Sequence, residues 1–529
     1  MTNVSSEFTQ FVILSYSLNI YLSHMGLSSK LMAPTTLFIV LSLSLSLTIT
    51  HIQSNEEGFI SVQIFEKGLD FAKDLLIDKA VSSIIPLQLP DIEKTVKIRL
   101  IGKVHILLSN ITINQVDIAS SYVSTGESGI VLVASGATAN LSMRWMYSYT
   151  TWLIPIAITD KGDASVQVEG MVVGLTATLE NQEGKLKLHL LECGCHVKDI
   201  SIKLDGGASW LYQGVVDAFE AKIASAVESS VSNKIREGII KLDSLLQSFP
   251  EHIPVYSIAV LNVTFVDSPV LSNSSIEFDI NGEVTSKDAV LVSNHNHKGW
   301  KDSFSCSSLA KMVQISLQDD VFNSASLVYF DEDYMHWLVD KVPDQSLLNT
   351  TGWRYIAPQL YKQYPNDDMN LNISVSSPPI IKVAKDDVDA VINLDMIIYV
   401  MDAGQVIPVA CISLEISTSG SAEILGNNLA GSIRLKDFTT YLKWSEIGDL
   451  QIHLLQPVMS TLIETVLLPY VNLHLRRGIP LPLPHGFTLE NAEIVCTCSR
   501  VIVCSDLALP GQYHLSSSHF ATTKHSNVT

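Results

Sequence analysis

The chain has 529 residues and carries 34 Lys and Arg against 54 Asp and Glu, which gives a formal net charge of −20 at pH 7. A hydrophobic fraction of 47% with 17% charged residues excludes a mainly disordered chain. The acidic balance argues against a general nucleic-acid-binding protein, which needs a basic surface. At this length we expect at least two sizeable domains.

The start of the chain has the pattern of a secretory leader. An apolar run over residues 37–50 follows Met32, with Lys30 just before it and polar residues after it. We therefore expect an upstream extension over residues 1–31, a signal peptide over residues 32–54, and a secreted protein. The alternative is an uncleaved anchor, although the run is shorter than the roughly 20 residues of a membrane span. Sequons fit the secretory route and predict glycosylation at Asn110, Asn140, Asn262, Asn273, Asn349 and Asn372.

After the leader, the pattern predicts one helix and then many strands. Residues 58–84 are expected to be helical up to the residue before Pro86, with Leu69 and Leu76 on the apolar face. Residues 96–106 alternate between apolar and cationic side chains, which indicates a strand with one core face and one cationic face. Further alternating runs, separated by turns such as Asp160–Asp163 and Asn181–Gly184, predict an antiparallel meander over residues 111–118, 129–133, 139–144, 164–179 and 186–197.

The dominant element is a long amphipathic helix over residues 207–249. About 40 residues at 1.5 Å each make a helix of roughly 60 Å, so its apolar face needs an equally long partner. We expect a strongly curved antiparallel sheet in that place, with an elongated apolar groove between helix and sheet. The apolar residues recur at steps of three and four and are Trp210, Leu211, Val215, Phe219, Ile223, Val227, Val231, Ile235, Ile239, Leu242 and Leu246.

The second half repeats this plan loosely. Residues 251–281 contain Pro254 and Pro269 between extended apolar runs, and we expect a linker that contributes strands to a shared central sheet. The order of helix, sheet and helix then occurs again, without an aligned residue repeat. The predicted elements are strands over 276–284, a helix over 325–342, strands over 369–435 and a helix over 450–475 that bears Leu454, Val458 and Leu462.

Five segments in order resemble the bactericidal/permeability-increasing and lipopolysaccharide-binding protein family, most closely its plant branch. The resemblance runs from about residue 58 to 507 and rests on residues 101–113, 139–145, 168–173, 210–235 and 478–494. It implies an α+β fold: an elongated boomerang of two similar barrels, each a highly curved antiparallel sheet wrapped on a long helix, joined by a central sheet. The implied domains are an N-terminal lipid-binding barrel over 58–250, a linker and central sheet over 251–281, a C-terminal barrel over 282–507 and a polar tail over 508–529.

The sequence departs from the animal members of that family in two places. Those members link a cysteine at the position of Cys193 or Cys195 to one in the long helix, but this chain has no cysteine near Ile235, so the link is missing or rerouted. The seven cysteines leave at least one unpaired. Over residues 144–153, which correspond to the lysine-rich loop of the animal endotoxin binders, aromatic residues have replaced most of the charge.

Two sets of residues are candidates for contact with a lipid surface. The cationic set suits anionic phosphates, with a solvated strand face as the alternative, and comprises Lys94, Lys97, Arg99, Lys103 and Arg144. The aromatic set suits the bilayer interface, although alternation within a strand would bury half of it, and comprises Trp145, Tyr147, Tyr149 and Trp152. The implied lipid pockets are expected to be lined by Leu69, Leu76, Leu211, Val215, Phe219, Ile223, Leu454, Val458 and Leu462.

These features predict a secreted, extracellular and non-enzymatic protein, in the apoplast or cell wall of a plant. We expect it to bind lipopolysaccharide through lipid A, and phospholipid, at the bacterial outer membrane surface as a monomer in innate defence, without cofactor or nucleic acid. A phospholipid or sterol-ester transfer protein is the alternative. A lipid hydrolase ranks below both, because no nucleophile motif is present. No metal site is expected, since the spacings of His295 with His297 and of Cys496, Cys498 and Cys504 match no standard zinc module.

Overall fold

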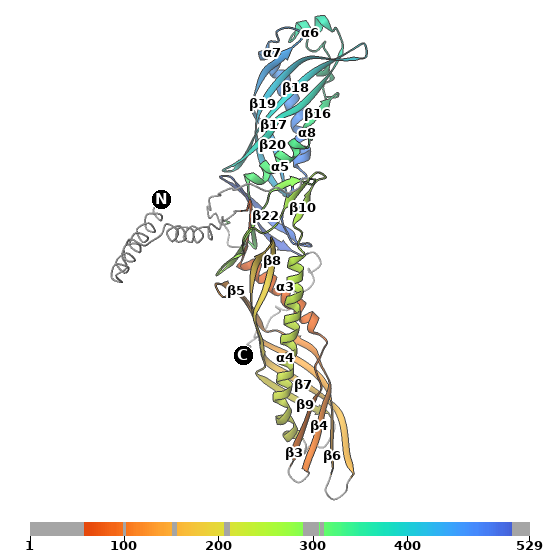
Figure 1. Cartoon of the computed structure of the whole chain (residues 1–529), viewed down its shortest axis with the longest axis vertical. Helices are drawn as coiled ribbons and strands as arrows, with labels where there is room; N and C mark the ends of the chain where they lie inside the picture. The colour runs from red at the N-terminus through yellow and green to blue at the C-terminus, as the bar shows by residue number, and fades with distance from the viewer. Residues whose placement is uncertain are drawn as a thin grey trace, which may run out of the picture. The chain divides into compact units, whose positions relative to one another are not determined.

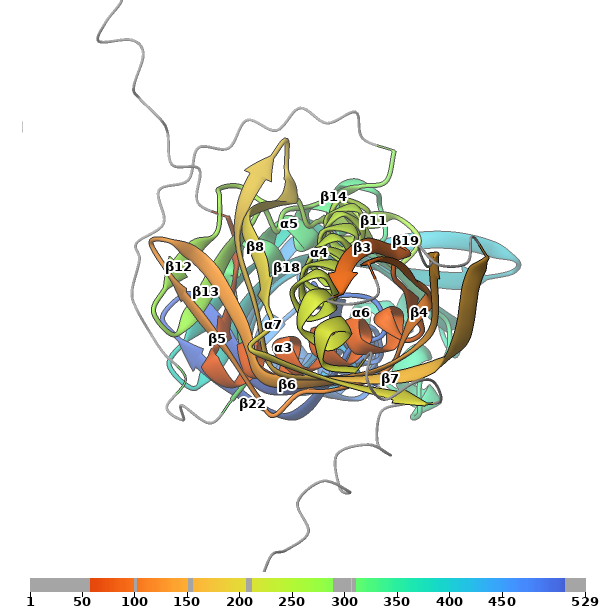
Figure 2. The same cartoon turned by 90° about the horizontal axis from the view of Figure 1, so that it is seen from below.

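Helix α4 (Tyr212–Gln247) lies along the first sheet and confirms the long amphipathic helix expected from the sequence (Figure 1). It contacts strands β3 (Ile92–Ile98), β8 (Lys185–His196) and β9 (Asp199–Asp205). Seen from below, the helix sits inside the curve of the sheet (Figure 2). Its inward residues at steps of four are at most 3% exposed and are Phe219, Ile223, Val227 and Val231.

The computed structural model describes residues 58–98, 102–150, 156–205, 212–288, 306 and 311–509, without the side chains of 212–218. The predicted extension, the signal peptide and nearly all of the predicted polar tail lie outside these residues.

The first sheet is antiparallel and has the strand order β2-β4-β6-β7-β8, with β3 on β4, β5 on β6 and β9 on β7. The expected meander is present, but neighbouring runs merge into long strands. The strands not yet bounded are β2 (Leu87–Gln88), β4 (Gly102–Asp117), β5 (Ser120–Gly126), β6 (Gly129–Thr150) and β7 (Ala157–Gln182).

The turn predicted over residues 160–163 is wrong, because these residues lie inside β7 and pair with β6. Gly162 is needed there for close approach rather than for turning. A Cβ atom on Gly162 would lie 2.5 Å from a ring carbon of Trp145, so only glycine lets the indole pack on the strand. The other predicted turn is confirmed, since Glu183 and Gly184 adopt positive φ between β7 and β8.

The helix predicted from residue 58 is wrong over its first turns. Residues 60–65 form strand β1 (Ile60–Phe65), and helix α3 (Glu66–Ile84) follows. The cause is visible in the sequence, because Ile60, Val62 and Ile64 alternate with polar residues at a period of two. Strand β1 pairs with β13 (Ser275–Ile280) on one side and β15 (Val313–Gln318) on the other.

These strands belong to a central sheet with the order β12-β13-β1-β15-β23-β22. It collects segments from both ends of the described chain, with β12 (Val270–Ser272), β22 (Thr488–Thr497) and β23 (Arg500–Ala508) completing it. Residues 251–281 contribute β12 and β13 to it. They also contribute two strands of a smaller sheet, which consists of β10 (His252–Val255), β11 (Ala259–Asn262) and β14 (Val284–Ser286).

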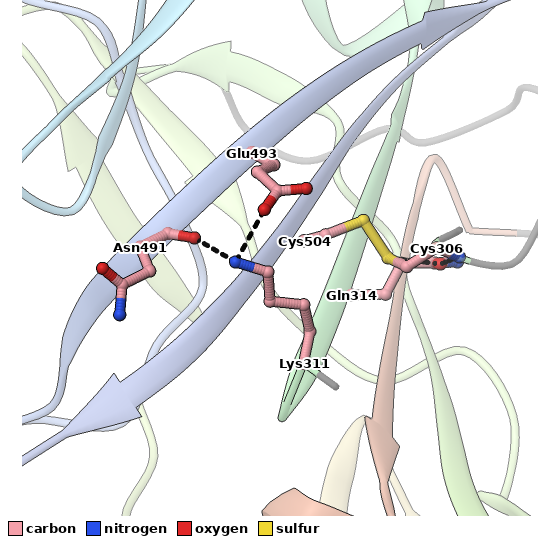
Figure 3. The surroundings of a disulfide bond; sticks show 6 residues. All are labelled: Cys306, Lys311, Gln314, Asn491, Glu493 and Cys504. Atoms are coloured by element: carbon pink, nitrogen blue, oxygen red, sulfur yellow. Dashed lines mark hydrogen bonds and ion pairs between the residues drawn. A yellow bond between two sulfur atoms is a disulfide. The ribbon is translucent and has the colours of Figure 1, made fainter. Parts of the chain in front are cut away.

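A disulfide links Cys306, which precedes strand β15, to Cys504 in strand β23 (Figure 3). The side-chain oxygen of Gln314 accepts a hydrogen bond from the backbone N–H of Cys306 at 2.8 Å. Close by, the buried ammonium group of Lys311 donates to the carbonyl oxygen of Asn491 and pairs with Glu493 at 2.9 Å.

The second half has its own antiparallel sheet, with the order β16-β17-β18-β19-β20-β21. The helix predicted over 325–342 is wrong in its second part, because helix α5 (Asp319–Asp331) ends and β16 (His336–Val339) follows. Asp333 adopts a φ of 57° between them, which a continuing helix does not allow. The remaining strands of this sheet are β17 (Asp368–Ala384), β18 (Asp387–Asp402), β19 (Gln405–Leu425), β20 (Asn428–Ser445) and β21 (Ile479–Pro480).

The predicted last helix is confirmed as a continuous helical run over 452–475. It consists of α7 (Ile452–Leu462), a π-helical turn η4 (Ile463–Leu467) and α8 (Leu468–Leu475). The run has 24 residues, and an 18-residue window of it has a mean hydropathy of 1.4, which would suit a membrane span by length and composition. Here its apolar face joins the core of the second sheet. The short helices η3 (Gln345–Leu348) and α6 (Pro358–Gln363) lie between β16 and β17 in sequence.

The antiparallel sheets with long helices packed on them agree with the predicted α+β class. Among the described strands, neither large sheet closes on itself, because the pairing runs from β2 to β8 and from β16 to β21 without joining the ends. The expected pair of closed barrels is therefore not confirmed. Helix α4 packs on the first sheet, and the helical run over 452–475 packs on the second.

Candidate lipid-binding site

The layer between α4 and the first sheet is apolar along most of its length. Phe219 and Ile223 are 1% and 0% exposed and pack with inward residues of β4, β6 and β7. These two residues were predicted for the lipid pocket and lie together there. Leu211 and the side chain of Val215 lie outside the described parts of the chain.

Helix α3 does not bring its two predicted pocket residues to that layer. Leu69 is buried in a separate cluster with Leu186, Ile276 and Phe278. Leu76 is 41% exposed. The sequence placed both on one apolar face, but the face is shared between the central sheet and solvent.

The second half has an apolar layer of its own. Val458 and Leu462 are buried there, whereas Leu454 is 38% exposed. A cavity of about 20 Å³ lies between the helical run and β16 to β19. This is little more than the space of one water molecule, so an acyl chain enters only if helix and sheet separate. The cavity is lined by Val339, Leu371, Ile373, Leu394, Met396, Leu414, Ile416, Met459, Leu462, Ile463, Val466 and Leu467.

The predicted cations occupy both faces of the first hairpin. Lys97 of β3 and Lys103 of β4 are direct cross-strand partners and both are exposed. Lys94 lies on the other face of β3 from Lys97, because it is three residues away from Lys97 and two from Ile92, whose face it shares. Arg99 lies outside the described residues.

Arg144 is farther along the sheet. Its guanidinium lies 3.8 Å from a carboxylate oxygen of Asp163, and both side chains are more than 70% exposed. Such a pair contributes little to stability in water. It leaves the arginine accessible to a stronger anionic partner.

The aromatic residues turn inward, as the alternative of strand alternation had allowed. Trp145 and Tyr147 are each 6% exposed, Tyr149 is partly buried, and Trp152 lies outside the described segments. The rings of Trp145 and Tyr147 stack with centroids 5.8 Å apart, and those of Tyr147 and Tyr149 are 6.2 Å apart. The indole N–H of Trp145 donates to the carbonyl oxygen of Asp163 at 3.0 Å.

Burial of this stack changes the chemistry of its central ring. Desolvation, with Asp160 as the next cause, raises the pKa of Tyr147 above its ordinary value. Tyr147 is thus held as a neutral phenol within an apolar wall. Burial of Trp145 and Tyr147 contradicts the expected exposed rings on that strand.

The sequence analysis missed two exposed apolar residues at the β6–β7 hairpin. Ile156 and Ile158 of the β6–β7 hairpin are 66% and 42% exposed. Ile158 pairs directly with Tyr149, so it shares the inner face of the sheet. The apolar layer thus runs from buried Trp145 to exposed Ile156. The sequence held one sign of this arrangement. The two isoleucines are an even number of residues from buried Ala164 and Val166, so they belong to the same face of the strand.

The two cysteines at the position of the animal members' link are free, in line with the expectation that this link is missing or rerouted. Cys193 and Cys195 are both unpaired, and the thiol of Cys193 lies 3.9 Å from the carbonyl oxygen of Ser232 in α4. Burial, followed by Glu228, raises the pKa of Cys195 to about 12, which makes its thiolate scarce at neutral pH. The link is therefore absent at this place, and a disulfide is found instead at Cys306 and Cys504.

The predicted glycosylation residues differ in accessibility. Asn110, Asn140 and Asn273 are exposed. Asn262 and Asn349 are only partly exposed, and their side chains hold local hydrogen bonds to Thr264 and Thr351. Asn372 lies within β17 and is also partly exposed.

Metal ligands do not gather in the described part of the chain, where no group of three or more His, Cys, Asp or Glu residues could hold an ion. His295 and His297 lie outside it. Cys504 is taken by the disulfide, while Cys496 and Cys498 are free.

The chain is similar to curated proteins over most of its length. It is 55% identical over 452 residues to a putative BPI/LBP family protein of Arabidopsis thaliana, covering 85% of this chain and 93% of that protein. It is 24% identical to the bactericidal permeability-increasing protein of Sebastes schlegelii, with 85% of this chain and 95% of that protein covered. Human lipopolysaccharide-binding protein is 23% identical, with 80% and 87% covered.

Structure and family models agree with these relatives. A crystal structure of lipopolysaccharide binding protein matches with a TM-score of 0.59 at 19% identity, covering 86% of this chain and 99% of that one. This likeness shows the fold. The N-terminal domain model of the LBP/BPI/CETP family matches residues 68–248, and the C-terminal domain model matches residues 254–508. With both domain models matched in order, and with a relative at 55% identity, the chain belongs to the LBP/BPI/CETP family.

Proposed function

We propose that this protein is secreted and binds lipopolysaccharide, through lipid A, and related amphipathic lipids in innate defence against bacteria. Lipid binding follows from membership of a family of lipid-binding and lipid-transfer proteins. The finer choice of lipopolysaccharide is supported by relatives named for that ligand and for bactericidal action. No covalent step on the lipid is part of the proposal.

One observation carries the proposal: an inner apolar layer reaches the surface beside a pair of lysines. The layer passes from Trp145 to exposed Ile156 on the β6–β7 hairpin. Lys97 and Lys103 stand exposed on the β3–β4 hairpin, and β4 pairs directly with β6. The lysine pair and the exposed end of the apolar layer therefore lie at the same end of the first sheet but on opposite faces, so a ligand with both phosphate and acyl chains would contact them around that end.

The two features act in sequence. The lysines attract anionic phosphates, although each exposed contact is weak in salt. Acyl chain that follows into the apolar layer gains about 0.8 kcal/mol per buried CH₂ group. A few carbons therefore outweigh the ion pairs, so charge governs encounter and the apolar layer governs retention.

The remaining parts of the proposal concern the state of the protein. We propose a monomer with carbohydrate at the exposed residues Asn110, Asn140 and Asn273. Its surface would meet the bacterial outer membrane or free lipopolysaccharide outside the cell.

The test measures binding of the secreted protein to vesicles that contain lipid A. We expect Lys97→Ala with Lys103→Ala to slow association about tenfold at low salt and less at high salt. The matched control is Lys362→Ala with Lys382→Ala, which removes two exposed positive charges from the second half. Equal loss in both pairs would contradict a role for this hairpin, and the absence of lipid A binding would remove the endotoxin proposal.

A phospholipid or sterol-ester transfer protein is the second candidate. It is favoured by the second apolar layer, whose cavity lies far along the chain from the lysine pair. Movement of labelled phospholipid between vesicles, with no response to lipid A, would select this function.

A further inference from the structure

Helix α4 is held on the first sheet in two different ways along its length. In its first part, the inward side chains from Phe219 to Val231 are at most 3% exposed. From residue 232 to residue 247, none of the helical residues is buried. A Cβ atom on Gly238 would meet nothing within 4 Å, so there is open space beside the helix at that point. The end of α4 is therefore packed much less tightly than its first part.

Polar side chains hold this end of the helix on strand β8, which lies beside it (Figure 1). Strand β8 ends the path β2-β4-β6-β7-β8, and among the described strands it pairs only with β7. Its other edge is bonded by α4 instead. The carboxylate of Asp243 accepts from the backbone N–H of Leu188 at 2.8 Å. The guanidinium of Arg236 donates to the carbonyl oxygen of Cys193 at 3.4 Å.

These bonding residues form a row along one side of the helix. Arg236 and Asp243 are seven residues apart, which is two turns, so both side chains leave the helix in the same direction. The second oxygen of Asp243 accepts from the side-chain amide of Gln247 at 2.9 Å, which fixes the carboxylate. Glu228 begins the row, where the helix is still buried, and accepts from the backbone N–H of Val197 at 2.8 Å.

The inward apolar side of α4 continues behind this row but is only partly packed. Ile235 packs against the main core cluster of the first sheet, and Leu246 packs against the separate cluster that contains Leu186. Ile239 and Leu242 lie between them on the same side of the helix. They belong to none of the apolar clusters of the described core. Apolar surface is therefore available where polar bonds hold the helix in place.

We propose that residues 232–247 of α4 form a latch on the free edge of β8 that controls entry of acyl chains into the apolar layer of the first sheet. In the closed state, Arg236 and Asp243 bond the backbone of β8. In the open state, the end of the helix has moved away from β8, water solvates the released groups, and an acyl chain covers Ile239 and Leu242. The latch rests on the proposed lipid-binding function and adds the residues that control the entry step.

Hydrogen bonds suit a reversible latch, because water replaces them when it opens. Each net bond shifts an equilibrium about fivefold, so two bonds hold the latch closed by a factor of about 25. Each CH₂ group that is buried shifts the equilibrium about fourfold in the other direction. Three or four CH₂ groups therefore outweigh both bonds. Lipid binds the open state better and opens the latch, which closes again when the lipid leaves.

The test is the rate at which the full chain takes up lipid, followed by stopped-flow fluorescence. The probe is a self-quenched, acyl-labelled phosphatidylglycerol in phosphatidylglycerol vesicles. Asp243→Ala and Arg236→Ala each remove one bond to β8 and leave the apolar side intact. We expect each variant to take up lipid about fivefold faster and to release it at an unchanged rate, because release starts from the open state. A variant that merely damages the fold would bind lipid more weakly.

Two matched variants remove the same charges from the same part of the helix. Glu237→Ala removes an exposed carboxylate that pairs with Lys234 of the same helix at 2.7 Å. Lys241→Ala removes an exposed cation. Both should leave the uptake rate unchanged. The apolar layer of the second half is the same in all of these proteins, so a difference in rate reports the first half.

Hydrogen exchange measures the latch directly. Residues 185–197 of the β8 segment should exchange faster in Asp243→Ala than in Glu237→Ala, and faster in the unaltered protein once lipid is added. An unchanged or slower uptake in both Asp243→Ala and Arg236→Ala, or an equal gain in the matched variants, would overturn the latch while leaving lipid binding intact. No uptake of lipid by the unaltered protein would overturn the proposed function and the latch together.

Discussion

Cys306 and Cys504 are joined across 198 residues of sequence, with their Cα atoms 6.2 Å apart. Replacing both by serine removes a cross-link that limits the unfolded chain. We expect a loss of about 2–4 kcal/mol in the free energy of unfolding, measured by denaturant titration. Cys498→Ser alters an exposed free thiol and should change stability by less than about 0.5 kcal/mol. An unchanged midpoint in the double variant would contradict a stabilising role for the bond.

The indole of Trp145 is a core group on the strand where the sequence suggested a surface anchor. Trp145→Ala removes its ring stack with Tyr147 and its hydrogen bond to Asp163, and should cost about 3–5 kcal/mol in thermal or chemical unfolding. Its neighbour Met146 is 43% exposed, so Met146→Ala should cost less than about 0.5 kcal/mol. Similar stability in the two variants would show that the stack does not support the sheet.

The amide of Asn472 holds strand β20 at its free edge. Its Oδ1 accepts from the backbone N–H of Ile433 at 2.7 Å, and its Nδ2 donates to the carbonyl oxygen of the same residue at 2.9 Å. Asn472→Ala leaves both backbone groups without this partner and should cost about 1–3 kcal/mol in denaturant unfolding. Asn472→Asp keeps the acceptor and loses the donor, so a smaller loss is expected. Equal losses in the two variants would mean that the acceptor contributes nothing to stability and that the whole loss comes from the missing donor.

Stability of the second half should depend on pH through Asp387. The hydroxyl of Ser419 donates to the Asp387 carboxylate at 2.5 Å, and this hydrogen bond is the main cause that lowers the pKa of Asp387 below its ordinary value. A carboxyl with a lowered native pKa stabilises the fold above its unfolded pKa of about 3.9, and this contribution is lost as the pH falls through the native value. Ser419→Ala raises the native pKa, so acid unfolding should begin at a higher pH.

Circular dichroism during acid titration measures that shift. Ser421→Ala serves as the control, because Ser421 is exposed and bonds only to the hydroxyl of Ser432 among the described contacts. The same acid midpoint in all three proteins would exclude Asp387 as the responsible group.

Sequence periodicity located the large elements because burial enforces it. The α4 helix keeps Phe219, Ile223, Val227 and Val231 at steps of four, and the structure buries all four against one sheet. The last helix was found for the same reason. Strand β1 was missed because its six residues stand directly before the amphipathic helix α3, and two periods over so short a stretch are easily joined into one.

The candidate site was less accessible from the sequence. Alternation along β6 put Trp145 and Tyr147 on one face, but only their burial in the structure shows that this face is the inner one and that the strand continues past them. The ring contact between Tyr256 and Tyr329 was not predictable, because the two residues are far apart in sequence and meet only where the β10–β11 turn approaches α5. Isolated aromatic residues carry no periodic signal of such a meeting.

Strand β1 stands early in the chain, yet its two neighbours are β13 and β15, which begin at residues 275 and 313. During synthesis, more than two hundred further residues must therefore be added after β1 before either of its partner strands has been made. The outer strand β23 arrives only at residues 500–508. Pairings over such separations form slowly, so the first sheet and α4 can assemble early, and completion of the central sheet becomes a late step in the folding of the whole chain.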